Sequence, residues 1–100
     1  MGKMQNLNHI ILSGKVLSIS PNSYTPSGVL IQRFFLEHDS QQFDSGVKRK
    51  VNCKLLCLLL NTKLSDKNIV IGSHVTIEGF ISMNSKEQIV LNIQNLNVIS

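Results

Sequence analysis

The segment Val47–Leu60, VKRKVNCKLLCLLL, constrains the fold more than any other part of this chain. Its polar and apolar residues alternate with a period of two, which is the period of a β-strand and not that of a helix. One face is polar and consists of Lys48, Lys50, Asn52 and Lys54. The other face is apolar apart from Arg49 and consists of Val47, Val51, Cys53, Leu55, Cys57 and Leu59. A strand that is basic outside and apolar inside predicts a small barrel whose outer wall meets an anion, and a nucleic-acid backbone is the obvious candidate.

The chain has the length and composition of one small folded domain. It contains 100 residues, of which 42% are hydrophobic and 16% are charged, and a chain of this length can bury a single modest core. We therefore expect one domain over residues 1–100, with residues 1–7 as a flexible N-terminus. The net charge is +4, and four of the ten basic residues lie between positions 48 and 54. This clustering favours an acidic partner.

The sequence lacks the signals of secreted, membrane-spanning and catalytic proteins. The N-terminus has no long apolar segment with a cleavage site, and the longest apolar run, Leu55–Leu60, is far too short to span a bilayer. There is no nucleophile elbow, phosphate-binding glycine loop or metal-ligand cluster. Glu37 and His38 are adjacent on a predicted strand and therefore point to opposite faces. We expect a cytoplasmic protein that is not an enzyme and uses no cofactor and no metal.

The two cysteines are predicted to be free thiols. Cys53 and Cys57 lie on one strand, four residues apart, which corresponds to about 13 Å and exceeds the roughly 7 Å over which a disulfide forms. Their spacing is not that of a zinc site. We expect both side chains to be buried as small apolar groups.

Five β-strands account for most of the chain, and turn-forming segments separate them. These segments are PNSYTPSG, the polar loop DSQQFDSG, the connector NTKLSDKN with room for one helical turn, and the hairpin NSKEQ. We predict strands at residues 8–20, 29–38, 47–60, 69–83 and 89–99. Gly14, Gly72 and Gly79 are expected bend points, and a bulge is expected near Asn95.

The strand pattern predicts an all-β closed barrel. Five strands without sustained helical periodicity favour a barrel over an immunoglobulin-like sandwich, which typically needs about seven strands. In the second and fourth strands, the side chains predicted to face the core are Leu30, Phe34, Leu36, Ile71, Val75, Ile77, Phe80 and Ile81.

Five motifs occur in an order that is typical of a known family. They are IILSGKV (Ile10–Val16), PSG (Pro26–Gly28), FFLEH (Phe34–His38), Cys53 and VTIEGFIS (Val75–Ser82). Over nearly its whole length the chain resembles the family of primosomal replication protein N, also called PriB, a relative of single-stranded DNA-binding protein. The resemblance implies a five-stranded OB-fold barrel, a homodimer and no catalysis. It also implies binding of single-stranded DNA on the outer barrel wall, and contacts with the helicase PriA and the loader protein DnaT in the replication-restart primosome.

The resemblance extends to the DNA-contact residues only in part. Arg49 stands where the family has a basic residue, but Asn52 and Asp39 stand where its best-known member has a tryptophan and an arginine. Val47 replaces an aromatic residue, and the short NSKEQ hairpin retains only Lys86 as a cation. Because an aromatic ring stacked on a base contributes about 1–3 kcal/mol, we expect DNA binding that is largely electrostatic and weaker than in that member.

The residues predicted to contact nucleic acid leave two functions open. Alternation places Phe35 on the outer face beside Arg33, where it either replaces the missing stacking aromatic or is turned inward by a bulge or covered by a loop. Phe43 is either a stacking residue or a loop anchor. The full set is Arg33, Phe35, Phe43, Lys48, Arg49, Lys50, Asn52, Lys54 and Lys86. The first function is a DNA-binding adaptor of the primosome. The second, favoured by Asn52 and Asp39, is mainly a protein–protein adaptor with weak or lost DNA binding. An RNA-binding barrel fits the charge but not the motif order.

Overall fold

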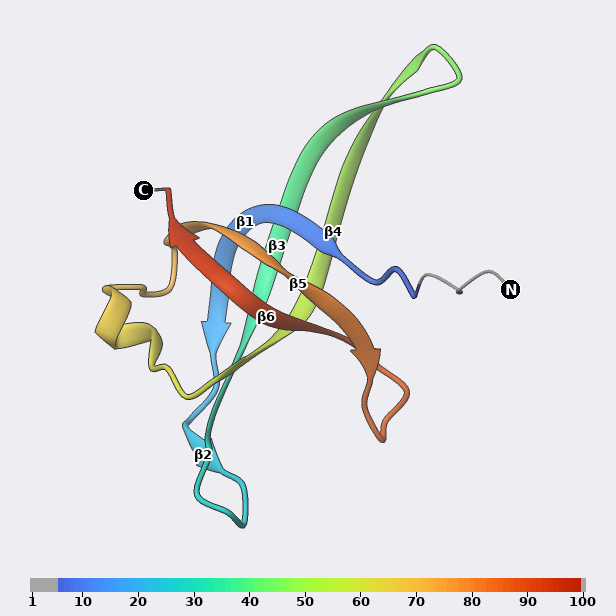
Figure 1. The fold of residues 1–100 in the computed structure, drawn as a ribbon. Helices are drawn as coiled ribbons and strands as arrows, with labels where there is room; N and C mark the ends of the chain where they lie inside the picture. Colours follow the sequence, from blue (N-terminus) through green and yellow to red (C-terminus); the bar gives the residue numbers. More distant parts are fainter. Residues whose placement is uncertain (1–5, 100) are drawn as a thin grey trace.

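The structure is a computed structural model and describes residues 6–99. Within these residues the chain forms six strands and one 3₁₀ turn, which are arranged as in Figure 1. They are β1 (Ile10–Ile19), β2 (Ser23–Tyr24), β3 (Leu30–Asp44), β4 (Val47–Leu60), the 3₁₀ turn η1 (Leu64–Lys67), β5 (His74–Met83) and β6 (Ile89–Val98). Most of the expected flexible segment, residues 1–7, lies outside the described residues. Within residues 6–99, η1 is four residues long and the structure holds no candidate membrane-spanning helix.

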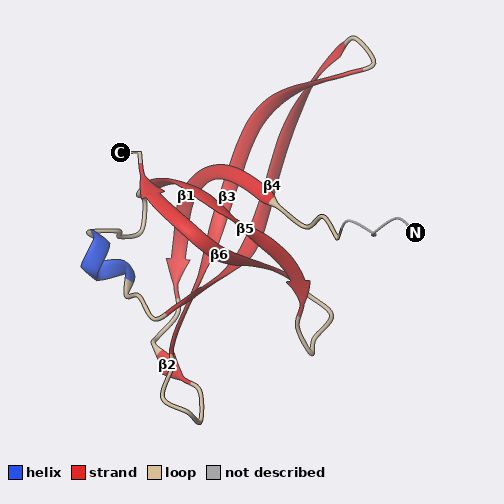
Figure 2. Ribbon diagram, in the orientation of Figure 1, coloured by secondary structure: helices blue, strands red, loops and turns tan. Residues whose placement is uncertain are grey.

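Five of the strands close into a barrel. Hydrogen bonds connect them in the order β1–β5–β6–β4–β3, and a further pairing between β3 and β1 closes the circle. β4 and β6 run parallel, whereas the other neighbouring strands are antiparallel. Figure 2 shows the strands curving around one another, with η1 beside the barrel. This architecture is the OB fold, and it confirms the predicted all-β barrel.

β1 serves two sides of the barrel because it bends. Residues 10–15 pair with β5, and residues 15–19 pair with β3. Gly14 lies at the bend, where an added Cβ atom would be 2.5 Å from the carbonyl oxygen of Glu37. The close approach of the β3 backbone explains why position 14 is a glycine, whereas the irregularity in the β1–β3 register lies between Val16 and Ser18.

Inward side chains from the barrel strands form one apolar core. Phe34 and Leu36 of β3 are fully buried, as their alternation predicts. Leu64 of η1 and Ile69 are almost fully buried as well, so the predicted helical turn packs its one apolar side chain against the core. The remaining members are Val16, Cys57, Leu59, Val75, Ile77, Leu91 and Leu96.

One buried histidine joins β1 to β3. His38 is 9% exposed, with Nδ1 2.7 Å from the carbonyl oxygen of Ser13 and Nε2 2.8 Å from Ser40 Oγ. Both ring nitrogens therefore have partners, as burial of a polar group requires. Glu37 lies on the opposite face of the strand, which confirms that the two side chains do not share a site.

The residues that precede β1 are attached to β5 by side chains. Asn8 Nδ2 donates to the carbonyl oxygen of Ile81 at 2.8 Å, and Asn8 Oδ1 accepts from the Ile81 N–H at 2.9 Å. His9 Nε2 lies 2.5 Å from Glu78 Oε2, and Asn95 Nδ2 donates to Glu78 Oε1. These two hydrogen bonds, that of His9 first, lower the pKa of the Glu78 carboxyl.

β5 begins later and buries fewer side chains than the sequence predicts. It begins at His74 and not at residue 69, because a turn with Gly72 at φ +95° precedes it. Ile71 lies in that turn and is 64% exposed, so its prediction as a core residue is wrong. Phe80 is 37% exposed on the outer face of β5, and its core assignment is also wrong. Ile81 is 38% exposed although its register partner Leu91 is buried, so its prediction as a core residue is wrong as well.

β5 and β6 lie very close together at a bulge. The register shifts after Glu78 and leaves Gln94 opposite no residue, one position from the bulge predicted near Asn95. An added Cβ atom on Gly79 would lie 1.8 Å from the carbonyl oxygen of Asn92. Glycine at this position is therefore a steric requirement of barrel closure.

The hairpin between β3 and β4 is the largest departure from the sequence-based prediction. The segment 39–46 is not a polar loop, because β3 continues to Asp44 and pairs with β4 without interruption. Ser45 and Gly46 form the turn, with φ of 54° and 79°. Two positive φ values are what a two-residue hairpin turn needs to match the twist of its strands.

The far end of this hairpin extends beyond the barrel, as Figure 1 shows at its upper right. Residues 41–50 are all exposed, and we call them the arm. Val47 lies in the arm and is 62% exposed, so its predicted burial is wrong. The reason is that alternation alone does not bury a side chain where no core lies beneath the strand.

Both cysteines are free, as predicted, but they differ in burial. Cys53 is half-buried, whereas Cys57 is fully buried and burial raises the pKa of its thiol to about 12. At pH 8 such a thiol is almost entirely protonated, and only the thiolate is nucleophilic. We expect a thiol reagent to modify Cys53 far faster than Cys57 in the native protein, and both after denaturation. Mass spectrometry of modified thiols tests this, and rapid native modification of both contradicts it.

Candidate nucleic-acid interface

The outward side chains of β3 and β4 form one continuous surface from the barrel to the tip of the arm, which we call the outer face. The strand register arranges them in six cross-strand pairs. From barrel to tip these are Arg33–Leu58, Phe35–Leu56, Glu37–Lys54, Asp39–Asn52, Gln41–Lys50 and Phe43–Lys48. Seven of the nine predicted contact residues therefore share this face. Lys86 lies in the β5–β6 hairpin, and Arg49 lies on the opposite face of β4.

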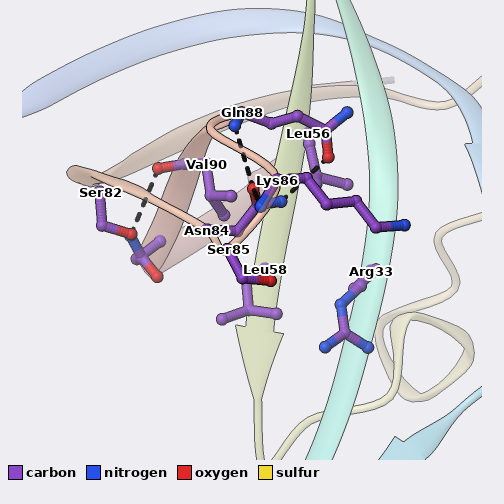
Figure 3. A pocket seen from close by; sticks show the side chains of 10 residues that line it. Arg33, Leu56, Leu58, Ser82, Asn84, Ser85, Lys86, Gln88 and Val90 are labelled. Atoms are coloured by element: carbon purple, nitrogen blue, oxygen red, sulfur yellow. Dashed lines mark hydrogen bonds between the residues drawn. The ribbon is translucent and has the colours of Figure 1, made fainter.

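A groove of about 440 Å³ opens where the outer face meets the hairpin between β5 and β6 (Figure 3). Its apolar lining is Leu56, Leu58 and Val90, and its polar lining is Arg33, Ser82, Asn84, Ser85, Lys86, Gln88 and Asn92. Figure 3 shows Lys86 extending from the hairpin toward β3, the strand that carries Arg33. An apolar surface that shares a groove with two cations can accept flat bases while the cations neutralise phosphates.

Amide side chains fix the shape of the β5–β6 hairpin. Asn84 Oδ1 accepts hydrogen bonds from the backbone N–H groups of Lys86 and Gln88, at 2.9 and 3.0 Å. Asn84 Nδ2 donates to Gln88 Oε1, and Asn92 Nδ2 donates to Ser82 Oγ at 2.9 Å. The hairpin thus holds Lys86 at the groove through its own side chains.

Phe35 is outward and 38% exposed, beside its pair partner Leu56. The alternative in which Phe35 turns into the core is therefore wrong, while its role in stacking stays a prediction. Leu56 and Leu58 were not predicted as part of the interface. The signal for them is the apolar run Leu55–Leu60, in which both faces of the strand are apolar, so one apolar face must lie outside the barrel.

Two carboxylates interrupt the basic character of the outer face. Asn52 Nδ2 donates to Asp39 Oδ1 at 2.5 Å and lies 3.4 Å from Glu37 Oε2. Lys54 stands opposite Glu37 in the register. We call these four residues the carboxylate rows. The predicted basic face is therefore discontinuous, and the Asn52 amide is already engaged within the protein.

The tip of the arm presents an aromatic ring beside cations. Phe43 is 77% exposed, so it is not a buried loop anchor, and its pair partner is Lys48. Among residues 6–99, no ion pair involves Lys48 or Lys50. Arg49 instead lies 2.7 Å from the carboxylate of Asp44, in an exposed pair on the other face. Lys48 and Lys50 are thus the arm cations available to a ligand of the outer face.

Comparisons with known proteins place the chain in a family. A sequence model described as "another single-strand binding protein family" matches residues 8–95. Replication restart protein PriB of Nitrosomonas europaea is 32% identical over 98 residues, which cover 94% of this chain and 90% of that protein.

Solved structures agree with the fold. PriB from Ralstonia solanacearum has a TM-score of 0.84 and 22% identity, covering 95% of this chain and 100% of that one. The PriB N-terminal domain from Thermoanaerobacter tencongensis, described as dimeric, has a TM-score of 0.69 and 23% identity, covering 93% and 97%. Plasmodium falciparum SSB in complex with ssDNA has a TM-score of 0.70 and 17% identity, covering 99% and 100%. At these identities the three structures support the fold alone.

The predicted resemblance is therefore confirmed by full-length sequence similarity, by the family match and by the barrel itself. The chain belongs to the PriB family of replication restart proteins, within the wider single-strand binding family.

Proposed function

We propose that this chain is a non-catalytic adaptor of replication restart that binds single-stranded DNA on its outer face. The observation that carries the proposal is the groove, whose lining combines the apolar side chains of Leu56 and Leu58 with the cations Arg33 and Lys86. Phe35, beside this groove, supplies an exposed ring on which a base can stack. The structural neighbour Plasmodium falciparum SSB is bound to ssDNA, which supports the same use of this fold.

We further propose that the chain acts in the cytoplasm as a homodimer that bridges PriA and DnaT. Among the described residues, residues 10–12 of β1 pair with β5 alone, and β3 approaches β1 only from Ser13 onward, so the backbone edge of residues 10–12 is available to a second copy. Ile11, in this segment, is 65% exposed. The dimeric PriB domain of Thermoanaerobacter tencongensis supports the dimer. The two protein partners rest on the resemblance to the PriB family.

A second candidate function is a protein–protein adaptor with weak or lost DNA binding. The carboxylate rows favour it, because Asp39 and Glu37 stand in the middle of the outer face and Asn52 is bound to both. Carboxylates on this surface repel a phosphate backbone, which lowers the affinity of the whole face for nucleic acid.

One titration separates the two candidates. Labelled oligo-dT, duplex DNA and single-stranded RNA are titrated with the protein at three salt concentrations. Micromolar or tighter binding of oligo-dT that weakens with salt supports the first function. Undetectable oligo-dT binding by a protein that still binds purified PriA rejects it and leaves the adaptor. Tighter binding of RNA than of oligo-dT also contradicts the first function.

Removing the two groove cations should flatten the salt dependence of DNA binding. For single strands, each neutralised phosphate contributes about −0.7 to the slope of log affinity against log salt, so Arg33→Ala with Lys86→Ala should reduce the slope by about 1.4. The matched control is Lys63→Ala with Lys67→Ala, which removes two exposed cations at η1, away from the groove. An equal change in both variants would show that net charge, and not the groove, sets the slope.

A further inference from the structure

The outer face has two regions that can bind nucleic acid, and a region that repels it lies between them. At the barrel end, Arg33 and Phe35 lie beside the groove. At the arm tip, Phe43 is 77% exposed beside Lys48. The carboxylate rows lie between these regions, and their one amide, Asn52, already donates to both carboxylates.

The spacing of the two aromatic rings sets the length of DNA that can touch both. Phe35 and Phe43 lie on the same strand, eight positions apart, which corresponds to about 26 Å at the rise of an extended strand. A stacked nucleic-acid strand advances about 3.4 Å per nucleotide, so about eight stacked nucleotides separate a base at one ring from a base at the other. A strand that only fills the groove therefore does not reach the arm.

We propose that the DNA-binding face is bipartite. The groove holds one short single-stranded segment. The arm tip forms a second contact, in which Phe43 stacks on a base and Lys48 and Lys50 neutralise phosphates. Glu37 and Asp39 repel the backbone between the two contacts, so the arm binds only strands long enough to pass over them. This inference rests on the proposed function, because it requires single-stranded DNA on the outer face.

Because of the carboxylate rows, we expect binding at the arm to depend on the length of the DNA strand. Lys54 and Lys15 flank Glu37 in the strand registers and offset part of its charge. Asp39 stands opposite neutral Asn52 on β4, so it has no cation as a register partner, although Lys15 lines the same hollow as Asp39 and Glu37. The energetic barrier between the two contacts is therefore greatest at Asp39.

A length series of oligo-dT tests the proposal. Strands of about four to sixteen nucleotides, the usual range of site sizes for one OB fold, are titrated with three forms of the protein. The first is the unaltered protein, and the second carries Phe43→Ala with Lys48→Ala. The third, a matched control, carries Tyr24→Ala with Lys63→Ala, which removes an exposed aromatic and an exposed lysine outside the arm, on β2 and just before η1.

The expected result is an affinity that rises with length in two steps. The arm variant should lose the second step, so that its affinity for the longest strand falls at least about fivefold, the lower end of the range for stacking on one base. Its affinity for the shortest strand should not change. The control should keep both steps. In a further variant, Glu37→Gln with Asp39→Asn, the two steps should merge because strands of intermediate length bind more tightly.

Two results would overturn the bipartite face. One is a second increase in affinity that is still present in the arm variant. That result would assign the second increase to the groove of a second protomer. The other is an affinity that rises smoothly with strand length and does so equally in all the variants. Absence of binding at every length would instead reject the proposed function, and this inference with it.

Discussion

The substitution Gly79→Ala is expected to lower the free energy of unfolding by at least about 3 kcal/mol, the upper part of the usual range for overpacking. The added Cβ atom would lie 1.8 Å from the carbonyl oxygen of Asn92 and 2.8 Å from its carbonyl carbon. Both are backbone atoms of β6, so no side-chain rotation can relieve the overlap. The strands must separate at the bulge, which loosens the β5–β6 pairing that helps close the barrel.

Thermal unfolding followed by circular dichroism measures this effect. For a domain of this size, a loss of about 3 kcal/mol corresponds to a fall in Tm of about 12 °C or more. Gly72→Ala is the control, because its φ of +95° disfavours alanine but no atom lies within 4 Å of the added Cβ. Its cost should stay near the 1–2 kcal/mol of a left-handed residue. If the two variants unfold at the same temperature, steric contact at Gly79 is not what the barrel depends on.

Replacing each of the two adjacent phenylalanines of β3 by alanine is expected to have different effects. The Phe34 variant should lose stability, and the Phe35 variant should lose DNA affinity. Phe34 is fully buried in the core, so Phe34→Ala should cost about 3–5 kcal/mol of stability. Phe35 is 38% exposed beside the groove, so Phe35→Ala should cost less than about 2 kcal/mol. Binding of oligo-dT by Phe35→Ala should weaken by about 1–3 kcal/mol, the contribution of one aromatic–base stack. That range is about a fivefold to 150-fold loss of affinity.

Each phenylalanine variant needs two measurements, unfolding and oligo-dT titration at one fixed salt concentration. Phe35→Trp is the matched rescue, because tryptophan keeps a stacking ring on the outer face and should retain DNA affinity. A folded Phe35→Ala protein that binds oligo-dT as tightly as the unaltered chain would remove stacking at Phe35 from the proposal. Strong destabilisation by Phe35→Ala would instead show that the ring supports the barrel.

The sequence predicted most of the barrel because its strands have two unlike faces. The segment Val47–Leu60 was predicted with the bounds that β4 has, and the burial of Phe34 and Leu36 followed from their alternation. A special role for Gly14 was also predicted, although the close approach of the Glu37 backbone that requires a glycine there is visible only in the structure. These features depend on residues close together in the chain, and local patterns carry that information.

The errors have a different cause, which is that burial depends on what lies across from a strand. Val47 and Ile71 belong to apolar patterns but are exposed, because one lies in the arm and the other in a turn. The polar segment 39–46 reads as a loop, yet β4 supplies backbone partners that hold it as a strand. Backbone pairing with β4 therefore overrides the weak strand propensity of this polar segment.

The sequence by itself determined an all-β barrel, a basic polar face on β4 and the resemblance to PriB, because alternation, turn residues and short motifs are properties of the chain. Tertiary structure decided what that basic face can do. Pairing with β3 places Asp39 and Glu37 beside Asn52, and it places Phe43 beside Lys48 at the tip of the arm. Packing of the β5–β6 hairpin against the outer face creates the groove. The charge that a surface presents is the sum over neighbouring strands, and only the register of those strands decides which charges become neighbours.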